Sequence, residues 1–269
     1  MAGRIGILAA ASIGLLSIGA APAPQTAPPM TAPPPGASGY LGPALPDTYA
    51  ILPPSPAKGS PREKTDQAVF QATRALKDTP RWALAQNDAN QAAIVQDLAC
   101  AIGVELTPQN APKTFALILK MAPDVSRATN RPKDIYKRPR PYLLYGGDIC
   151  VPKTESLAAS PDYPSGHNGW GWAIGLIMAE LAPDRATPIL MRARAFGESR
   201  MVCGVHSLSA VQAGRLNGSI VVAALHGDPA FRADLDGARA EVAAVRRSGP
   251  VPDPVACARE ARLVAQNPY

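Results

Sequence analysis

Two histidines and three cationic residues are spaced along the sequence in a way that suits chemistry on an anion. Six residues separate Lys133 from Arg140, and five separate Arg200 from His206. Arginine presents a planar pair of hydrogen-bond donors and lysine a compact charge, which together fit the oxygens of a phosphoryl group. His167 and His206 can attack, donate a proton or accept one near neutral pH. These residue types indicate phosphoryl transfer.

A turn of the sequence Pro-Ser-Gly-His, residues 164–167, precedes a strongly apolar run. We expect a helix to begin near Asn168 to Trp170. The first N–H groups of a helix have no partner within it and favour an anion. The hydroxyl of Ser165 and the N–H groups of Ser165 and Gly166 are therefore predicted to bind phosphate together with the cations.

Each of these segments also has an ordinary interpretation when it is read alone. His206 could be a core histidine bonded to a carbonyl, and Pro-Ser-Gly could be a simple turn. A solvated basic loop would also account for the cations at positions 131, 133, 137, 138 and 140. The net charge of +6 favours anions in general. Nucleic acid is not an expected partner, because no aromatic ladder or known binding module accompanies the basic run.

Taken together, the segments resemble the three-part signature of the phosphatidic acid phosphatase type 2 superfamily. The forms "YPSGH", "GESR" and "CGVH" are most similar to those of the bacterial class A nonspecific acid phosphatases. The similarity runs from about residue 40 to 265 and includes "PRWALAQNDA" and "GDPAFRADL". This resemblance implies an all-α helical bundle that hydrolyses phosphate monoesters, nucleotides included, without a metal ion or other cofactor. Homo-oligomers are also possible.

The resemblance assigns a role to each residue of the signature. His206 is implied to be the nucleophile that forms a phosphohistidine, and His167 the acid that protonates the leaving alcohol and then activates water. Phosphate binding is implied for Lys133, Arg140, Ser165, Gly166 and Arg200. The third histidine, His226, matches no part of the signature and is expected to be structural.

One position departs from the pattern of the superfamily. Its members usually carry an aspartate four residues beyond the nucleophilic histidine, where this chain has Ala210. Such a carboxylate holds the imidazole in the tautomer that can attack. A backbone carbonyl, Ser209 or a carboxylate remote in sequence could orient His206 instead. We expect a weakened phosphatase whose turnover rises in the variant Ala210→Asp.

Three other functions have to be weighed against the phosphatase. Loss of the aspartate could leave a non-catalytic phosphate-binding homologue, and a vanadium-dependent haloperoxidase uses a similar cradle of cations. A membrane lipid phosphatase of the same superfamily needs spanning helices. We expect none beyond the N-terminal region, because the most apolar later segment, residues 170–181, is short and contains Glu180. Stable membrane insertion is therefore not expected.

The order of apolar and proline-rich segments predicts one folded domain behind an export signal. Arg4 and the apolar run of residues 5–20 have the layout of a secretory signal peptide, which we assign to residues 1–21. Residues 22–40 are rich in proline and predict a flexible segment. The all-α domain is assigned to residues 41–269, with a helix from Asp228-Pro229 to about Arg246. This layout predicts a periplasmic or secreted protein.

Export to an oxidising compartment allows the four cysteines to form two disulfides. Three pairings are possible, and we favour Cys100 with Cys150 and Cys203 with Cys257. A metal site is not expected, because no two cysteines lie close enough in sequence to form a ligand pair.

Overall fold

The computed structural model describes residues 38–269, and that range contains helices and no strand. The predicted signal peptide and residues 22–37 of the predicted flexible segment lie outside the described residues. The helices are α1 (Thr48–Ile51), α2 (Pro61–Arg74), α3 (Pro80–Asn87), α4 (Ile94–Asp97), α5 (Ala99–Ile102), α6 (Pro112–Tyr136), α7 (Pro141–Tyr145), α8 (Glu155–Ala159), α9 (Gly166–Leu181), α10 (Ala186–Val202), α11 (Leu208–Leu225), α12 (Pro229–Ser248) and α13 (Pro254–Val264), with 3₁₀ turns at Gly42–Ala44, Gln91–Ala93 and Pro183–Arg185. The predicted all-α fold is confirmed.

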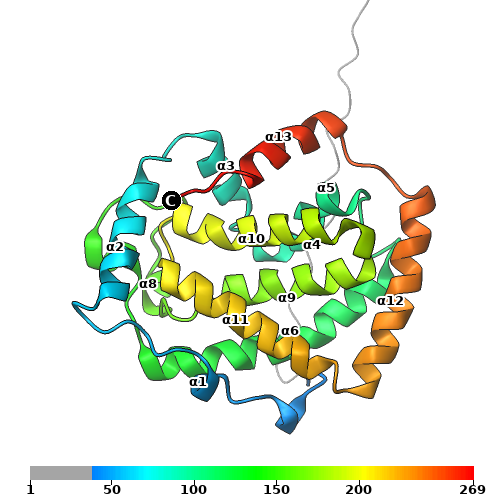
Figure 1. Cartoon of the computed structure of the whole chain (residues 1–269), viewed down its shortest axis with the longest axis horizontal. Coiled ribbons are helices and arrows are strands. Elements are labelled where there is room, and N and C mark those ends of the chain that lie inside the picture. The colour runs from blue at the N-terminus through cyan, green and yellow to red at the C-terminus, as the bar shows by residue number, and fades with distance from the viewer. Residues whose placement is uncertain (1–37) are drawn as a thin grey trace, which may run out of the picture.

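Helix α9 is the centre of the bundle and is covered by α10 and α11, with α6 and α12 also packed against it (Figure 1). Small residues allow this close packing. A Cβ atom on Gly175 would lie 2.3 Å from the Cβ of Ala193 on α10, and one on Gly218 of α11 would lie 2.6 Å from the carbonyl oxygen of Gly169. Glycine at both positions therefore lets neighbouring helices approach α9 almost backbone to backbone.

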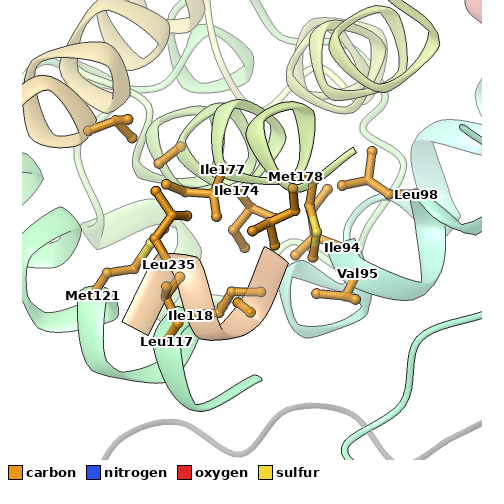
Figure 2. Packing of buried hydrophobic residues seen from close by; sticks show 14 of the residues in the cluster. Ile94, Val95, Leu98, Leu117, Ile118, Met121, Ile174, Ile177, Met178 and Leu235 are labelled. Atoms are coloured by element: carbon orange, nitrogen blue, oxygen red, sulfur yellow. The ribbon is translucent and has the colours of Figure 1, made fainter. Parts of the chain in front are cut away.

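The main hydrophobic core lies under α9, where several helices contribute aliphatic side chains (Figure 2). Helix α6 is amphipathic and contributes Leu117, Ile118 and Met121, while α9 contributes Ile174, Ile177 and Met178. Ile94, Leu98 and Ile102, which recur in the sequence at the spacing of one helix face, are fully buried, although the chain there forms two short helices, α4 and α5. Each large aliphatic side chain buried in such a core contributes about 1.5–3 kcal/mol.

Side-chain caps fix where the helices of the site begin. Ser165 accepts a hydrogen bond from the N–H of Asn168, so α9 begins at Gly166, two residues earlier than predicted. Ser207 caps α11 in the same way. The predicted cap at Asp228 is confirmed, because its side chain accepts from the N–H of Phe231 and α12 begins at the following proline. A cap of this kind contributes about 1 kcal/mol.

The last residues of the predicted flexible segment lie against α6. A Cβ atom on Gly39 would lie 2.2 Å from the carboxylate of Asp124. The N–H of Tyr40 donates to that carboxylate at 2.8 Å, and the Tyr40 hydroxyl donates to Asp234 at 2.8 Å. Gly39 and Tyr40 are therefore held against α6, because Asp124 offers them a buried acceptor.

One helix of the described chain, α11, is long and apolar enough to cross a membrane. The expectation that no spanning helix follows the N-terminal region rested on residues 170–181 and overlooked this helix. Residues of α11 pack closely against α9, and 61% of the helix is buried inside the protein. Length and composition do not distinguish a core helix of this kind from a membrane span.

The disulfide pairing differs from the predicted one. Cys100 on α5 pairs with Cys257 on α13, and Cys150 pairs with Cys203 beyond the end of α10. Helix α13 packs against α5 and α10, which brings Cys257 to Cys100. The N–H of Cys150 donates to the carbonyl of Cys203 at 3.0 Å, so these two chain segments run side by side. Helix packing, and not separation along the chain, decides which cysteines meet.

Candidate active site

The predicted site residues come from three helices and two connecting segments, near the ends of α6 and α10 and the starts of α7, α9 and α11. Lys133 lies in the last turn of α6, His167 in the first turn of α9 and Arg200 in the last turn of α10. Arg140 caps α7, and His206 immediately precedes the cap of α11. All five side chains are less than 10% exposed. The fold thus collects buried cations and two histidines that are far apart in sequence.

A tight turn accounts for the spacing of five residues between Arg200 and His206. The carbonyl of Arg200 accepts hydrogen bonds from the N–H groups of both Val205 and His206, at 3.1 and 3.2 Å. Gly204 has a φ of 81°, a left-handed conformation that glycine adopts without strain. The turn therefore places the guanidinium and the imidazole in one fixed relationship.

The guanidinium of Arg140 is held by several acceptors of the protein. Its Nε donates to the carbonyls of Leu157 and Ser160, and its Nη1 donates to the carbonyl of Val205 at 2.7 Å. Nη1 also lies 3.1 Å from Nε2 of His206. An arginine is always a donor, so Nε2 of His206 is the accepting nitrogen of this pair. The lone pair of Nε2 therefore faces a cation.

Arg200 and His167 have unused hydrogen-bonding atoms in the same buried region. Nε and Nη1 of Arg200 and Nε2 of His167 are buried and have no partner among the described residues. An unpaired buried donor costs about 1–3 kcal/mol. The unpaired nitrogens of Arg200 call for an anionic ligand that accepts from them, and Nε2 of His167 lies beside them without a partner in residues 38–269.

Lys133 and Ser160 complete the basic region. Nζ of Lys133 donates to the carbonyl of Pro161 at 2.6 Å and lies 3.4 Å from the hydroxyl of Ser160. Burial, with the nearby charge of Arg140, lowers the pKa of Lys133 to about 8. The ammonium therefore stays charged at mildly acid pH.

One backbone group at the start of α9, the N–H of Ser165, has a different partner from the one predicted from the sequence. The hydroxyl of Ser165 lies at the helix cap, but its N–H donates to the carbonyl of Ala210 at 2.9 Å. That N–H is therefore not available to an anion, which corrects the prediction for this one group. Gly166 and His167 occupy the first two positions of the helix, where an N–H has no carbonyl partner in its own helix.

Asp162 orients the ring of His206. Oδ1 of Asp162 lies 3.0 Å from Nδ1 of His206, and the carboxylate is fully buried. An ionised carboxylate only accepts, so Nδ1 carries the proton and Nε2 carries the lone pair, to which Nη1 of Arg140 donates. The remote carboxylate that the sequence left open as one of three orienting groups is Asp162.

Ala210 is therefore not a deficit, and the expectation that Ala210→Asp raises turnover is wrong in its premise. The side chain of Ala210 is fully buried and packs in a small cluster with Leu52, Tyr163 and Ala213. A carboxylate placed there would meet these apolar neighbours, among them Tyr163, which directly follows Asp162 in the chain. The group that position 210 lacks is already supplied from another segment.

Electrostatics keep both histidines neutral. Burial lowers the pKa of His206 well below 6.5, and Arg140, Lys133 and Arg200 lower it further. Burial also lowers the pKa of His167, with additional contributions from Arg200 and His206. A neutral imidazole is the form that can attack phosphorus.

Three residues of the site were not found from the sequence, namely Asp66, Arg138 and Asp162. All three are buried and linked to His206 by hydrogen bonds. A signal was available for Asp162, which lies five residues before His167 in "PDYPSGH". Asp66 lies on α2, 140 residues from the histidine that it serves, and no local pattern marks it.

His226 lies apart from this site, at the opposite end of α11 from His206. Its Nε2 lies 3.1 Å from the carboxylate of Glu180, and its ring packs edge-on against Phe231. Within residues 38–269, no three His, Cys, Asp or Glu side chains are grouped so that they could hold a metal ion.

Comparison with known proteins agrees with this geometry. The sequence signature of the PAP2 superfamily matches residues 114–232. An acid phosphatase from Zymomonas mobilis is 42% identical over 78% of this chain and 81% of its own length. Non-specific acid phosphatases from Providencia stuartii and Salmonella typhimurium are 37% and 33% identical, over 75% and 71% of this chain and 83% and 78% of theirs. A solved structure of a transmembrane PAP2 type phosphatidylglycerolphosphate phosphatase from Bacillus subtilis aligns with a TM-score of 0.49 and 16% identity, over 67% of this chain and 89% of that one.

The match to residues 114–232 and the relatives of 33–42% identity place this all-α chain in the PAP2 superfamily. The relatives that are 42% and 37% identical to the chain are acid phosphatases. The chain belongs to the acid phosphatase family of that superfamily.

Proposed function

We propose that the protein hydrolyses phosphate monoesters through a phosphohistidine formed on Nε2 of His206, without a metal ion. The observation that carries this proposal is the pair of contacts of the His206 ring. Asp162 accepts from Nδ1 at 3.0 Å, and Arg140 lies 3.1 Å from Nε2. The attacking nitrogen thus lies beside a cation that can bind the oxygens of the phosphoryl group.

In the first step, the lone pair of Nε2 attacks phosphorus and forms a P–N bond as the P–O bond to the alcohol breaks. The leaving oxygen takes a proton from His167. In the empty site His167 is neutral, because burial and Arg200 lower its pKa. The proton therefore arrives with the monoanion of the substrate, whose second pKa is about 6, or is taken up when the bound phosphate raises the pKa of His167. Either route favours mildly acid pH.

In the second step, water attacks phosphorus on the side that the alcohol has left. His167 accepts a proton from this water, the P–N bond breaks, and Nε2 regains its lone pair. Inorganic phosphate leaves with the added oxygen. The same residue acts as acid and then as base, as the reversal of proton flow requires.

Positive side chains are expected to stabilise the charge that spreads over the equatorial oxygens in both steps. Arg200 offers two nitrogens that have no partner in the described chain. Arg140 and Lys133 add two further charges, and the hydroxyl of Ser165 and the N–H of Gly166 complete the set. This number of cations supports a mechanism in which the protein itself neutralises the phosphate.

The substrates and the location of the protein follow from the same features. Every assigned residue serves the phosphoryl group, and relatives carry the name non-specific acid phosphatase. We therefore expect a range of phosphate monoesters, nucleotides among them. Two disulfides suit an oxidising compartment, and with the predicted signal peptide they support a periplasmic or secreted enzyme.

Trapping of the phosphoenzyme tests the mechanism. Purified protein is mixed with ³²P-labelled substrate and quenched in denaturant at alkaline pH, at which phosphohistidine survives. The wild type and His167→Ala should both retain label when the leaving group is a good one such as p-nitrophenolate. His206→Ala should retain none. His226→Gln is the matched control, since this histidine is hydrogen-bonded but distant from the site.

Label retained by His206→Ala, or a wild type that hydrolyses substrate and never retains label, would contradict the assignment of the nucleophile. Dependence on metal is tested separately. Activity should survive millimolar EDTA, and orthovanadate should compete with substrate because its five-coordinate adduct imitates the transition state. Loss of activity in EDTA that a divalent ion restores would contradict the metal-free mechanism.

A further inference from the structure

The carboxylate of Asp162 has both oxygens fixed behind the His206 ring. Oδ1 accepts from Nδ1 of His206 and from the N–H of Ser207, each at 3.0 Å. Oδ2 accepts from the hydroxyl of Ser207 at 2.6 Å. The N–H of Asp162 donates to the carbonyl of Arg138 at 2.7 Å. The chain therefore restrains this carboxylate through both its side chain and its backbone.

Arg138 joins Asp162 to a second buried carboxylate. Nη1 of Arg138 lies 3.3 Å from Oδ2 of Asp162, and Nη2 lies 2.8 Å from Oδ2 of Asp66. Nη1 also donates to the hydroxyls of Ser207 and Ser209, at 2.9 and 2.8 Å. Asp66 accepts from the N–H and the hydroxyl of Ser209, at 2.7 and 2.6 Å. The network thus connects α2, the segment before α7 and the start of α11.

The charges of this network suit the reaction. Two carboxylates around one guanidinium leave one net negative charge beside Nδ1 of His206. The imidazole gains positive charge when Nε2 bonds to phosphorus, and a buried negative charge behind the ring stabilises that form. Burial raises the pKa of Asp162, while Arg138 and the two donors of Ser207 oppose this rise. Arg138 therefore helps to keep the carboxylate ionised at acid pH.

We propose that Asp162 is the positioning residue for His206, and that Arg138 and Asp66 in turn position Asp162. The inference rests on the proposed phosphohistidine mechanism and adds residues that do not touch the phosphate. It also implies that the carboxylate that orients the histidine comes from a different chain segment than in the superfamily pattern. The usual place, four residues beyond the nucleophile, is occupied by Ala210, which packs against Tyr163, the neighbour of Asp162. In this chain the carboxylate at Nδ1 of His206 therefore comes from the segment before α9 and not from position 210.

The first experiment compares Asp162→Asn with a matched control, Asp124→Asn. Asp124 is also buried, accepts backbone N–H groups and pairs with an arginine, but it lies on α6 beside Tyr40. Asp162→Asn should lower kcat by a factor on the order of 10²–10⁴ and leave KM nearly unchanged, as in a protease triad that has lost its carboxylate. Asp124→Asn should lower the melting temperature without this loss in kcat. Similar kcat values for the two folded variants would overturn the proposal.

The second experiment uses the pH profile of kcat to isolate Arg138. Several groups face Asp162: Arg138, Arg140, Lys133, His206, Asp66 through Arg138, and Tyr145. Removing only the charge of Arg138 in Arg138→Gln raises the pKa of Asp162, so the fall of kcat on the acid side should move to higher pH by about one unit. The same change in an Asp162→Asn background should move nothing. If the fall of kcat at acid pH occurs at the same pH in Arg138→Gln as in the wild type, the proposed role of Arg138 is overturned.

The third experiment removes the carboxylate at position 162 and introduces one at position 210. Asp162→Ala should be nearly inactive, and the double variant Asp162→Ala/Ala210→Asp should recover at least tenfold in kcat. Ala210→Asp alone should lower activity. No recovery in a folded double variant would overturn the inference that a carboxylate at Nδ1 is what the site requires. In each variant, phosphoenzyme trapping shows whether His206 is still the nucleophile, so failure of this inference is distinguished from failure of the mechanism.

Discussion

The ring of His167 stacks on the ring of Phe196, with centroids 4.4 Å apart and planes inclined by 13°. A Cβ atom on Gly171 would lie 2.4 Å from the Phe196 ring, so this glycine makes room for it. Nε2 of His167 has no hydrogen-bond partner among the described residues. An aromatic stack therefore supports the proposed acid, whereas a carboxylate supports the proposed nucleophile.

The stack leads to the first prediction, which concerns leaving groups. Phe196→Leu should loosen the ring of His167 and lower kcat/KM about tenfold for alkyl phosphates, whose leaving oxygen needs a proton. Aryl phosphates such as p-nitrophenyl phosphate should lose much less. Steady-state rates on both kinds of substrate measure this difference. Equal losses on the two kinds would mean that Phe196 supports the fold and not the proton transfer.

The second prediction concerns Arg200, because two of its buried nitrogens have no hydrogen-bond partner among the described residues. Burial, together with the charge of Arg140, lowers the pKa of Arg200 to about 10, so the side chain is charged under all working conditions. Arg200→Gln should lower kcat/KM by a factor on the order of 10²–10³, as expected when one donor to the transition state is lost. The melting temperature should stay the same or rise, since a buried and partly unpaired charge is removed.

Inorganic phosphate supplies the control for Arg200. It should raise the melting temperature of the wild type by mass action and have little effect on Arg200→Gln. A variant that is strongly destabilised and still gains stability from phosphate would contradict the view that Arg200 is held for a ligand.

The third prediction concerns stability at acid pH. The pKa values of His167 and His206 are lowered in the folded protein, so between those values and about 6.5 the unfolded chain binds more protons. Stability should therefore fall as pH falls below about 6.5, by up to roughly 1.4 kcal/mol per pH unit for each histidine. Asp97 works in the opposite direction, because burial raises its pKa to about 7. Variants are needed to separate the two effects.

The double variant His167→Gln/His206→Gln isolates the histidines. Its melting temperature should change less between pH 7 and pH 5 than that of the wild type. His226→Gln should behave like the wild type, because its side chain is partly exposed. Phosphate should also reduce the loss in the wild type, since the anion stabilises protonated histidine. If the double variant loses as much stability in acid as the wild type, the two rings are not held neutral by the fold.

Local signals in the sequence were sufficient for the all-α fold class and for the start of α12. The pair Asp228-Pro229 marked the start of α12, because a cap and a proline act within one turn. The resemblance to a known signature supplied the joint significance of Lys133, Arg140, His167 and His206. Neither kind of reasoning needs knowledge of how the helices pack.

Contacts between distant segments could not be read from the sequence. The pairing of Cys100 with Cys257 depends on α13 packing against α5, and the contact of Asp162 with His206 depends on how the segment before α9 meets the start of α11. Both are decided by tertiary packing. The role of Ala210 could not be read from the sequence for the same reason. The superfamily pattern places the orienting carboxylate four residues after the histidine, whereas the carboxylate that contacts His206 here belongs to Asp162, 44 residues earlier in the chain.

The two disulfides carry the last prediction, because they lie at different distances from the site. Cys203 lies midway between Arg200 and His206, in the turn whose Val205 carbonyl accepts from Arg140. The other bond, between Cys100 and Cys257, holds α13 on the outer side of the bundle (Figure 1). With sequence separations of 53 and 157 for the two pairs of cysteines, loop-closure entropy gives roughly 4 and 5 kcal/mol of stabilisation. By stability alone, the two bonds are nearly equivalent.

Catalysis should separate them. Cys150→Ser/Cys203→Ser and Cys100→Ser/Cys257→Ser should both lower the melting temperature. At a temperature at which both variants are folded, the first should lose at least tenfold in kcat/KM, because the turn that fixes Arg200 relative to His206 loses its anchor to the segment at Cys150. The second should keep kcat/KM within about twofold of the wild type, because the polar contacts of α13 with α10 involve Arg192 and Arg194 and not Arg200. The reverse order of activities would show that the site is positioned through α13, and that the turn between Arg200 and His206 holds its geometry without the bond to Cys150.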